Sequence, residues 1–317
     1  MRKKILITGG IGFVGGRLAK KLSENFEVIV SSRNILSADN KNLHGIQFSI
    51  LHSDLLVVER FPTNIFAVIH LAALNEWDCV KYPSEAIRVN IDESRIILEN
   101  SIASGVSKFI YFSTAHIYRS PLNGDINEET LPFPAHPYAI THKAAEDYII
   151  AANLKKKIQG VVIRLSNSFG APVSPAVNRW TLLANDLSKQ AVENKKLKLL
   201  SNGCQYRDFV CLTDVENCIK KIVMSDSDKF NKLIYNLGSG IGLKVIDMAT
   251  MIIEVYKELY GETIPLELPE KATLSVEPYI QFSIDRLLKE GIVIKNDFKK
   301  ELKELLLFCN QNFKNNA

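Results

Sequence analysis

A glycine-rich turn near the start of the chain has the composition of a phosphate-binding loop. In "ILITGGIGFVGGRLAKKL" an apolar run leads into Gly9, Gly12 and Gly15, and a helical pattern follows at once. Glycines at this spacing allow a tight turn, close approach of backbone N–H groups to a pyrophosphate, and packing of helix on strand. The start of the helix adds unpaired N–H groups and a partial positive charge. We therefore predict a dinucleotide site that includes Gly9, Gly12, Phe13 and Val14.

The end of the second apolar run bears on which dinucleotide binds. A site that prefers NAD usually has an acid about twenty residues beyond the loop, where it binds the adenosine ribose. Here "VIVSSRN" supplies Ser31, Ser32 and Arg33 and no acid. Arginine suits the 2′-phosphate of NADP through a charge-assisted contact, although a strand-end arginine can also be a simple solvated charge. We predict NADP, with Ser32 and Arg33 as contacts, and NAD as the alternative.

The elements that must hold this loop follow an alternation of short apolar runs and longer helical patterns. Such alternation is typical of a parallel sheet covered by helices. With right-handed crossovers the strands form one doubly wound sheet of the Rossmann type, so the predicted fold class is α/β. The predicted strands cover residues 4–8, 27–32, 46–51, 66–72, 108–113 and 159–166, and the predicted helices cover 14–25, 83–104 and 138–156.

The pattern loosens beyond about residue 167, where loops with glycine and proline separate shorter elements. We predict a smaller C-terminal lobe that binds the substrate and is joined to the first domain without a clean linker. The predicted dinucleotide-binding domain covers residues 1–166 and a returning segment near 208–238, and the substrate-binding lobe covers 167–207 and 239–317.

Composition and charge argue against several other classes of protein. The chain has 317 residues, 46% of them apolar and 23% charged, as in an ordinary soluble globular protein. Its 39 basic and 35 acidic residues are spread along the chain, which argues against a nucleic-acid partner. The longest apolar stretches are too short to span a bilayer, and the basic N-terminus is not followed by a signal-peptide cleavage site.

The cysteines favour a reducing compartment. The five cysteines form no CxxC pair and are odd in number. Reduced thiols in a cytoplasmic protein are the simplest interpretation. The same spacing argues against a zinc site, so we predict no metal.

Several motifs resemble one known family. The spacing T-G-x-x-G-x-x-G from Thr8 resembles the extended short-chain dehydrogenase/reductase family, also called the epimerase/dehydratase family of nucleotide sugars. Further stretches resemble that family in the same order and together cover most of the chain. They are "SDLL" with Asp54 and Leu55, "HLAA" with His70, Leu71, Ala72 and Ala73, "RVNID" with Asn90, "FSTAHIY" with Thr114, "RLSNSFG" with Asn167 and "YRDF" with Arg207. The resemblance implies an NAD(P) cofactor and a nucleotide-diphosphate sugar as substrate.

The resemblance also assigns binding roles. It implies cofactor contacts at Asp54, Leu55, Leu71, Ala72, Ala73 and Asn90, and diphosphate contacts at Asn167 and Arg207. His70 and Asn90 could equally be satisfied polar groups of the core. Arg179 is a further cation that suits a diphosphate. For both arginines the alternative is an ion pair with a neighbouring acid.

The reacting groups are implied in the same way. In the family a Ser or Thr hydroxyl and a Tyr phenol hydrogen-bond a substrate hydroxyl or ketone, and the Tyr transfers the proton. Thr114 and Tyr138 match these positions, with hydride moving to or from the nicotinamide. Members that dehydrate sugars carry an acid pair after the Thr, whereas this chain has Ala115 and His116, which argues against dehydration. His116 is either an additional acid or base at the substrate or a polar group on the cleft wall.

His142 replaces the lysine that the family places four residues after the tyrosine. On an α-helix that position lies roughly 40° from Tyr138, whereas Lys143 lies roughly 140° away. Glu146 keeps the family register, so no residue is inserted. We therefore predict that His142 takes the lysine's place beside the cofactor and that Lys143 lies on the helix surface.

This replacement bears on the direction of the reaction. The family lysine is thought to hold the nicotinamide ribose and to lower the pKa of the tyrosine. Lowering a tyrosine pKa from about 10 to about 7 takes roughly 4 kcal/mol, about the effect of one positive charge at 4 Å. A histidine with a pKa near about 6.5 is largely neutral at neutral pH and supplies a hydrogen bond without the charge. Because ketone reduction needs the phenol as an acid, we predict a reductase that uses NADPH, with Tyr138 as the proton donor.

Two other functions stay open. An epimerase oxidises and re-reduces one carbon with a retained cofactor, and a sensor or scaffold binds NAD(P) without catalysis. The presence of both Thr114 and Tyr138 argues against the second. Family members often dimerise through two helices, here around residues 84–104 and 138–155, and the apolar face of "SRIILENSIAS" allows a homodimer.

Overall fold

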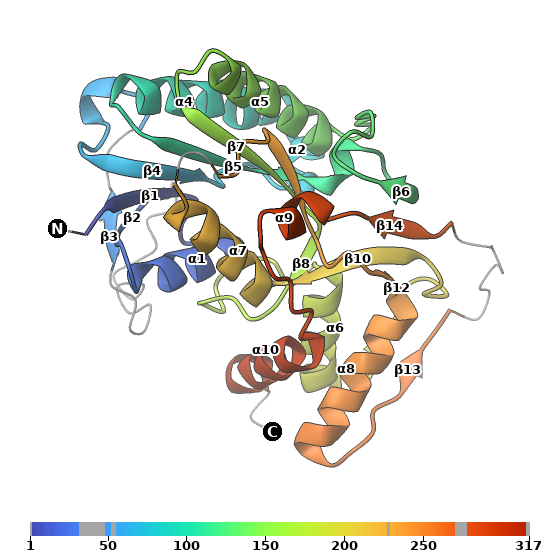
Figure 1. The fold of residues 1–317 in the computed structure, drawn as a ribbon. Coiled ribbons are helices and arrows are strands. Elements are labelled where there is room, and N and C mark those ends of the chain that lie inside the picture. The colour runs from blue at the N-terminus through green and yellow to red at the C-terminus, as the bar shows by residue number, and fades with distance from the viewer. Residues whose placement is uncertain (1, 32–47, 52–54, 227–228, 270–277, 315–317) are drawn as a thin grey trace.

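The structure, a computed structural model, describes residues 2–31, 48–51, 55–226, 229–269 and 278–314. Its main element is a seven-stranded sheet in which all neighbouring strands run parallel. In sheet order the strands are β11 (Ile234–Leu237), β7 (Gln159–Leu165), β5 (Lys108–Thr114), β4 (Ile65–His70), β1 (Lys4–Thr8), β2 (Glu27–Ser31) and β3 (Phe48–Leu51). This sheet confirms the predicted Rossmann-type α/β fold (Figure 1).

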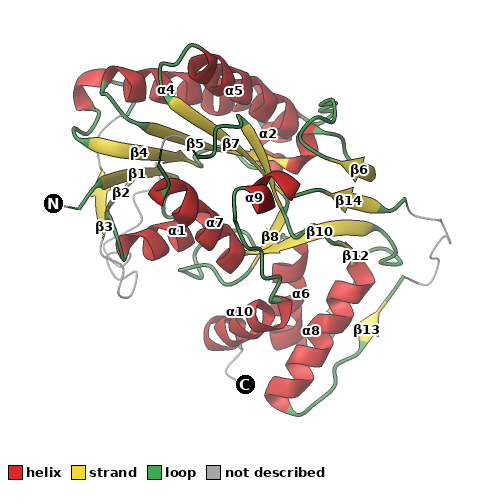
Figure 2. Cartoon of the chain, viewed as in Figure 1, coloured by secondary structure: helices red, strands yellow, loops and turns green. Residues whose placement is uncertain are grey.

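Helices cover both faces of the sheet, which is why its central strands are continuous apolar runs. On one face, α1 (Phe13–Ser23) and α7 (Leu212–Met224) pack against the sheet and each other. On the other face lie α4 (Ser94–Ala103) and α5 (Pro137–Leu154), as Figure 2 shows. The two helical layers thus bury the middle strands of the sheet almost completely.

The chain between β4 and α4 is more broken than the predicted single helix over 83–104. It contains α2 (Glu76–Lys81), α3 (Pro83–Ala86) and a π-helical stretch at Ile87–Glu93. This stretch packs against α5. π-Helical stretches inside helices are frequent at functional sites, because they re-aim side chains that a regular helix would place elsewhere.

The second half of the chain forms smaller sheets and a helical layer. β8 (Asn167–Phe169), β10 (Tyr206–Cys211) and β12 (Gly242–Lys244) make a three-stranded sheet. Two further pairs are β6 (Gly124–Ile126) with β14 (Ile280–Phe282), and β9 (Leu197–Lys198) with β13 (Leu266–Glu267). Three helices, α6 (Leu183–Asn194), α8 (Val245–Tyr260) and α10 (Phe298–Phe313), pack together around a separate apolar core. Short helical turns lie at Val58–Arg60, Ala115–Ile117 and α9 (Asp285–Lys289).

The two halves interleave. β11 returns the chain to the main sheet beside β7. Leu287 and Ile292, in and after α9, also pack into the core under that sheet, although they follow the predicted returning segment. The predicted domain boundaries themselves stay a prediction.

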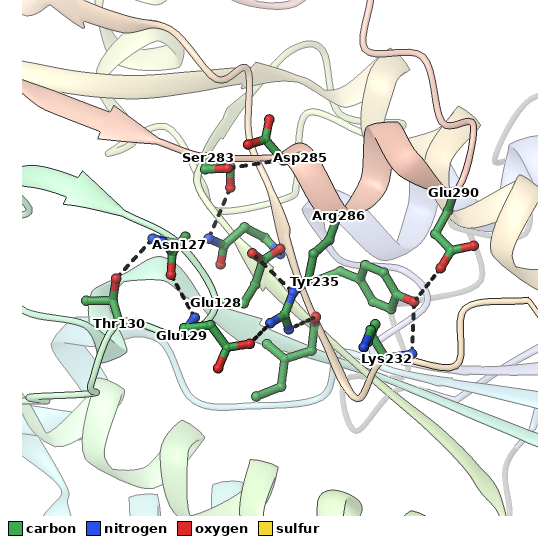
Figure 3. A network of polar contacts seen from close by, with 12 residues as sticks. Asn127, Glu128, Glu129, Thr130, Lys232, Tyr235, Ser283, Asp285, Arg286 and Glu290 are labelled. Atoms are coloured by element: carbon green, nitrogen blue, oxygen red, sulfur yellow. Dashed lines mark hydrogen bonds and ion pairs between the residues drawn. The ribbon is translucent and has the colours of Figure 1, made fainter.

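A polar network joins α9 to β11 and to the loop after β6 (Figure 3). The Arg286 guanidinium pairs with Glu128 at 3.6 Å and with Glu129, and it donates to the Ile234 carbonyl at 3.2 Å. Glu128 is buried and also accepts a hydrogen bond of 3.0 Å from the Asn236 backbone N–H. These contacts tie segments that are far apart in the sequence to the edge of the main sheet.

Candidate active site

A cavity of about 1230 Å³ opens at the carboxyl ends of β1, β4 and β5. The strand order reverses between β1 and β4, and ligands of open α/β sheets bind at such switch points. Small-molecule pockets usually have about 300–1,000 Å³, so this cavity has room for a dinucleotide and a second ligand. Its wall includes the predicted site residues Gly9, Gly12, Phe13, Val14, Leu55, Leu71, Ala72, Ala73, Thr114, His116, Tyr138, His142, Asn167 and Arg179.

The glycine turn has the geometry that an anion needs. Gly9 has a φ of +66°, in the left-handed region that favours glycine, and its N–H donates to the Ser31 carbonyl at 2.9 Å. A Cβ on Gly15 would lie 2.2 Å from the Gly9 carbonyl oxygen, so only glycine fits there. Helix α1 begins after Gly12 without a side-chain cap, which leaves its first N–H groups facing the cavity. The residues present therefore fit a pyrophosphate.

Behind this turn a buried chain of hydrogen bonds fixes the neighbouring wall. His70 lies between the Thr8 hydroxyl, 2.7 Å from its Nδ1, and the Ser94 hydroxyl, 2.9 Å from its Nε2. The backbone N–H groups of Leu71 and Ala72 donate to the Thr8 hydroxyl oxygen. Burial lowers the pKa of His70 to about 4, so its ring is neutral at neutral pH. His70 is therefore a satisfied polar group of the core that holds the turn after β4.

Thr114 and Tyr138 come together at the cavity from separate elements. Thr114 ends β5, and its hydroxyl oxygen accepts a hydrogen bond from the His116 N–H at 3.2 Å. Tyr138 stands in the first turn of α5, where the His136 side chain caps the helix by accepting from the Tyr138 N–H at 3.2 Å. Desolvation raises the pKa of Tyr138 to about 12, against a smaller opposing effect of the Arg179 guanidinium. The phenol is therefore protonated at neutral pH.

His142 lies one turn after Tyr138 on the same face of α5. It is buried, and its Nδ1 lies 2.8 Å from the Tyr111 hydroxyl. Its Nε2 is buried without a hydrogen-bond partner among the described residues, on a side chain that lines the cavity. Burial is the largest cause that lowers the pKa of His142 to about 3, followed by repulsion from the protonated form of His70 and from the Arg179 guanidinium. The position of the family lysine thus holds a neutral imidazole.

The helix is continuous from Pro137 to Leu154, so no bulge turns Lys143 inward. Lys143 instead pairs with Asp147 on the helix surface. Glu146, one turn after His142, is fully buried and pairs with Arg164 of β7 at 2.8 Å. This ion pair joins α5 to β7 of the main sheet.

The far wall of the cavity is polar and charged. The Arg179 guanidinium pairs with the Glu76 carboxylate of α2 at 3.2 Å. His116 has a buried Nδ1 without a partner among the described residues, and burial lowers the pKa of His116, with a further contribution from the Arg207 charge. A neutral imidazole with an unpaired nitrogen can form a hydrogen bond with a ligand at this wall.

Some predicted residues lie elsewhere. Asn90, in the π-helical stretch, is fully buried behind the wall, where it accepts from the Leu74 N–H at 2.7 Å and donates to Thr141 at 3.0 Å. Arg207 lines a second cavity of about 50 Å³ together with Asn167, and it donates to the Tyr206 carbonyl at 2.9 Å. The predicted contacts Ser32, Arg33 and Asp54 lie outside the described residues.

Several residues at the site were not predicted from the sequence. Glu76, Ser113 and His136 line the cavity, and Tyr111 contacts His142. Strand alternation carries a signal for Tyr111 and Ser113, because residues 109, 111 and 113 share the face of β5 that α5 covers. Nothing in the sequence connects Glu76 with Arg179, since 103 residues separate them.

The side chains of the described ranges also bear on metal binding and on membrane crossing. Within the described ranges no group of at least three His, Cys, Asp or Glu side chains is arranged to hold a metal ion. In those ranges no helix combines the length and the apolar composition that a membrane crossing requires. All five cysteines are free thiols.

Comparison with known proteins agrees with this geometry. Residues 5–238 match the NAD dependent epimerase/dehydratase family. The chain belongs to this family. The matched region contains the glycine turn, Thr114, Tyr138 and His142, and thus most of the cavity wall.

Two curated relatives show a low identity to this chain over most of its length. The dTDP-D-glucose 4,6-dehydratase of Mus musculus is 26% identical over 276 residues, which cover 82% of this chain and 75% of the mouse protein. The UDP-glucose 4-epimerase of Azospirillum brasilense is 23% identical over 312 residues, which cover 93% of this chain and 88% of the bacterial protein.

Solved structures of the family share the fold over nearly the whole chain. The UDP-N-acetylglucosamine 4-epimerase from Methanobrevibacter ruminantium M1, in complex with UDP-N-acetylmuramic acid, superposes with a TM-score of 0.80 at 20% identity, covering 97% of this chain and 98% of that one. The UDP-glucuronic acid 4-epimerase from Bacillus cereus, in complex with UDP-glucuronic acid and NAD, gives 0.78 at 22% identity and covers 97% and 99%.

Proposed function

We propose that the protein is an NAD(P)-dependent oxidoreductase that reduces a keto sugar carried on a nucleoside diphosphate. Family membership, and relatives named for activities on nucleotide sugars, support the substrate class. A cavity large enough for two ligands at the switch point of the sheet supports a dinucleotide and a sugar nucleotide side by side.

The observation that carries the direction of the reaction is the raised pKa of Tyr138 beside a neutral imidazole. Burial raises its pKa to about 12, and the imidazole in the place of the family lysine is itself neutral. A phenol with a high pKa holds its proton at neutral pH and can donate it to a developing alkoxide. Tyr138 therefore acts as the general acid.

The remaining groups bind and orient. The uncapped N-terminus of α1 and the glycine turn hold the pyrophosphate, and His142 directs its Nε2 to a hydroxyl of the nicotinamide ribose. When bound, the reduced cofactor supplies the hydride. Thr114 hydrogen-bonds the substrate carbonyl next to Tyr138, so that the ketone oxygen meets both hydroxyl groups. Arg179 and Arg207 bind the diphosphate, and Arg179 must then exchange its Glu76 partner for phosphate.

The preferred dinucleotide is NADP, because the second strand ends in Ser32 and Arg33 without an acid. Related structures with NAD, such as the Bacillus cereus epimerase, favour the alternative. Fluorescence titration with NADPH and NADH decides between them. We expect at least tenfold tighter binding of NADPH, roughly the effect of one charge-assisted contact. Tighter binding of NADH would refute the NADP assignment and leave the reductase assignment intact.

An epimerase is the second candidate, since relatives in both comparisons carry that name. It needs the same Tyr138 to act as base and acid in turn, with the cofactor retained. A dehydratase is less well supported, because Ala115 and His116 follow Thr114 where an acid pair is needed.

One set of assays separates these functions. A thermal-shift screen of GDP, UDP and dTDP with NADPH present identifies the nucleotide, and turnover of the matching 4-keto sugar is then followed by loss of NADPH absorbance. Stoichiometric oxidation of NADPH supports the reductase. Interconversion of sugars without net oxidation, by protein that retains its dinucleotide through purification, identifies an epimerase. Dinucleotide binding without turnover of any sugar identifies a sensor or scaffold.

A homodimer in the cytoplasm completes the proposal. Ile87, Ile140 and Tyr148 are exposed apolar residues on the predicted interface segments, with 57%, 47% and 46% of their surface accessible. A second copy that covers them removes this apolar surface from water. Light scattering checks the mass, and a monomer of 35.6 kDa at micromolar concentration contradicts the dimer.

A further inference from the structure

The two ring nitrogens of His142 have different surroundings. Nδ1 lies 2.8 Å from the hydroxyl of Tyr111, which points from β5 toward α5. Nε2 is buried and has no partner among the residues that the structure describes, although the side chain lines the cavity. One nitrogen is thus committed to the protein, and the other is available to a ligand.

The contact with Tyr111 decides which nitrogen carries the proton. A neutral imidazole has one N–H donor and one acceptor nitrogen, and a phenol has a single O–H donor. The Tyr111 hydroxyl is fully buried, and His142 Nδ1 is its hydrogen-bond partner in the described part of the chain. If Nδ1 carried the proton, the Tyr111 hydrogen would be buried without an acceptor, which is costly. Tyr111 must therefore donate to Nδ1, and the imidazole proton lies on Nε2.

Neither partner changes its charge near neutral pH. Burial, and next to it the charge of Glu146, raises the pKa of Tyr111 well above its ordinary value, so the phenol keeps its hydrogen. Burial lowers the pKa of His142 to about 3. The neighbouring ring of His70, stacked on Tyr111 with centroids 5.9 Å apart, is also neutral. The direction of the Tyr111–His142 hydrogen bond is therefore the same throughout the physiological range.

We propose that Tyr111 is a positioning residue that holds His142 in the Nε2–H form and so turns a histidine into a fixed hydrogen-bond donor for the ribose of the nicotinamide dinucleotide. The second half of this statement rests on the proposed function, because it needs a dinucleotide in the cavity. The first half does not. In place of a lysine ammonium, the pair provides a neutral hydrogen-bond donor, His142 Nε2–H. The Tyr111 hydroxyl, on strand β5, fixes which ring nitrogen is this donor.

Nitrogen NMR of protein labelled with ¹⁵N-histidine tests the first half without any variant. We expect the signals of His142, assigned by their loss in His142→Gln, to report protonated Nε2 and unprotonated Nδ1 from pH 6 to pH 8. A predominant Nδ1–H form in the wild type overturns the proposal. In Tyr111→Phe we expect a mixture of the two forms. Tyr118→Phe is the matched control, because it also removes one buried phenol hydrogen bond, to Asn236 at 2.7 Å, away from His142.

Titration with the reduced dinucleotide tests the second half. Losing a directed hydrogen bond is expected to raise the Kd of Tyr111→Phe by about fivefold. In a His142→Ala background the same substitution should change the Kd less than about twofold, since Tyr111 acts only through His142. An equal loss in both backgrounds means a purely structural role and overturns the proposal. Failure of the wild type to bind any dinucleotide refutes the proposed function. The NMR result tests the tautomer of His142, and hence the role of Tyr111, independently of that outcome.

Discussion

The ring of His142 packs edge-on against the ring of Tyr138, with their centroids 4.4 Å apart. A family lysine at this position would bring a positive charge close to the phenol and stabilise the phenolate. The neutral imidazole brings none, and burial then dominates the pKa of Tyr138. Under the proposed function, Tyr138 is then better suited to donate a proton than to remove one.

The first prediction concerns the pH dependence of reduction. With the reduced cofactor bound, the nicotinamide carries no positive charge, so only protein groups set the pKa of Tyr138. Because that pKa is raised to about 12, kcat/KM for ketone reduction should stay constant from pH 6 to pH 9. Steady-state rates over this range check it, with a pH-stability control at each point. A fall of the rate with a midpoint between pH 6 and pH 8 would contradict the assignment of a high pKa.

The second prediction concerns the missing charge. His142→Lys restores the family residue and should lower the pKa of Tyr138 by about 2–3 units, the effect of one charge at about 4 Å. The pH profile of reduction should then fall with a midpoint at about pH 9–10, because the wild-type pKa is about 12. His142→Gln, which stays neutral, is the control and should keep the flat profile. The ratio of kcat/KM for reduction to kcat/KM for oxidation is fixed by the equilibrium constant of the reaction, so this ratio cannot report the substitution. The measurement is therefore the pH at which the profile of reduction falls. Identical profiles for Lys and Gln would exclude an electrostatic role for this position.

The third prediction concerns stability in acid. His70 and His142 have pKa values of about 4 and about 3 in the folded protein, below the ordinary value of 6.5. The unfolded chain therefore binds more protons below pH 6.5, and stability is lost as the pH falls from there toward the folded pKa values. At pH 5 each histidine should cost roughly 2 kcal/mol. Urea unfolding at pH 5 and pH 7.5 checks this, and His70→Gln or His142→Gln should each reduce the loss of stability between these pH values by roughly 2 kcal/mol. An unchanged pH dependence in both variants would contradict burial of the neutral rings.

The fourth prediction concerns the network of Figure 3. Arg286→Met leaves the buried Glu128 carboxylate without its cation. Since Arg286 is partly exposed, the expected loss is about 2 kcal/mol, below the range for fully buried pairs. Arg95→Met is the matched control, because Arg95 pairs with Asp92 and Glu99 on an exposed helix face, where ion pairs contribute less than about 1 kcal/mol. Equal unfolding free energies for the two variants would show that the network adds no stability.

The fifth prediction concerns the glycine turn. A methyl group on Gly15 meets the Gly9 carbonyl oxygen at 2.2 Å, whereas one on Gly12 meets the same atom at 3.1 Å. Gly15→Ala should therefore weaken dinucleotide binding by roughly tenfold or more, and Gly12→Ala by less. Calorimetric titration checks the order of the two effects. The reverse order would mean that close approach of the ligand to Gly12, and not the packing of Gly15 against the Gly9 carbonyl, limits substitution in the turn.

Features that depend on local spacing could be predicted from the amino-acid order alone. Apolar runs of β-branched residues predicted the strands of the main sheet, and the glycine pattern predicted the turn at Gly9. The position of His142 followed from counting residues along one helix, because a continuous α-helix repeats about every 3.6 residues. Their prediction does not require the tertiary contacts of these segments.

The contacts of the polar side chains could not be predicted in this way, because they depend on how distant segments pack together. The sequence left Asn90 as either a cofactor contact or a polar group of the core, and the structure places it in a buried part of the π-helical stretch, bonded to Leu74 and Thr141. Tyr111 meets His142 from 31 residues away, and Arg179 meets Glu76 from 103 residues away. Such pairs form only when the crossovers bring strands and helices together, and their burial then sets the charge of each group. The histidine that replaces the lysine, and its neutral state near pH 7, are therefore predicted from the sequence, whereas its burial and the nitrogen that carries its proton come from the fold.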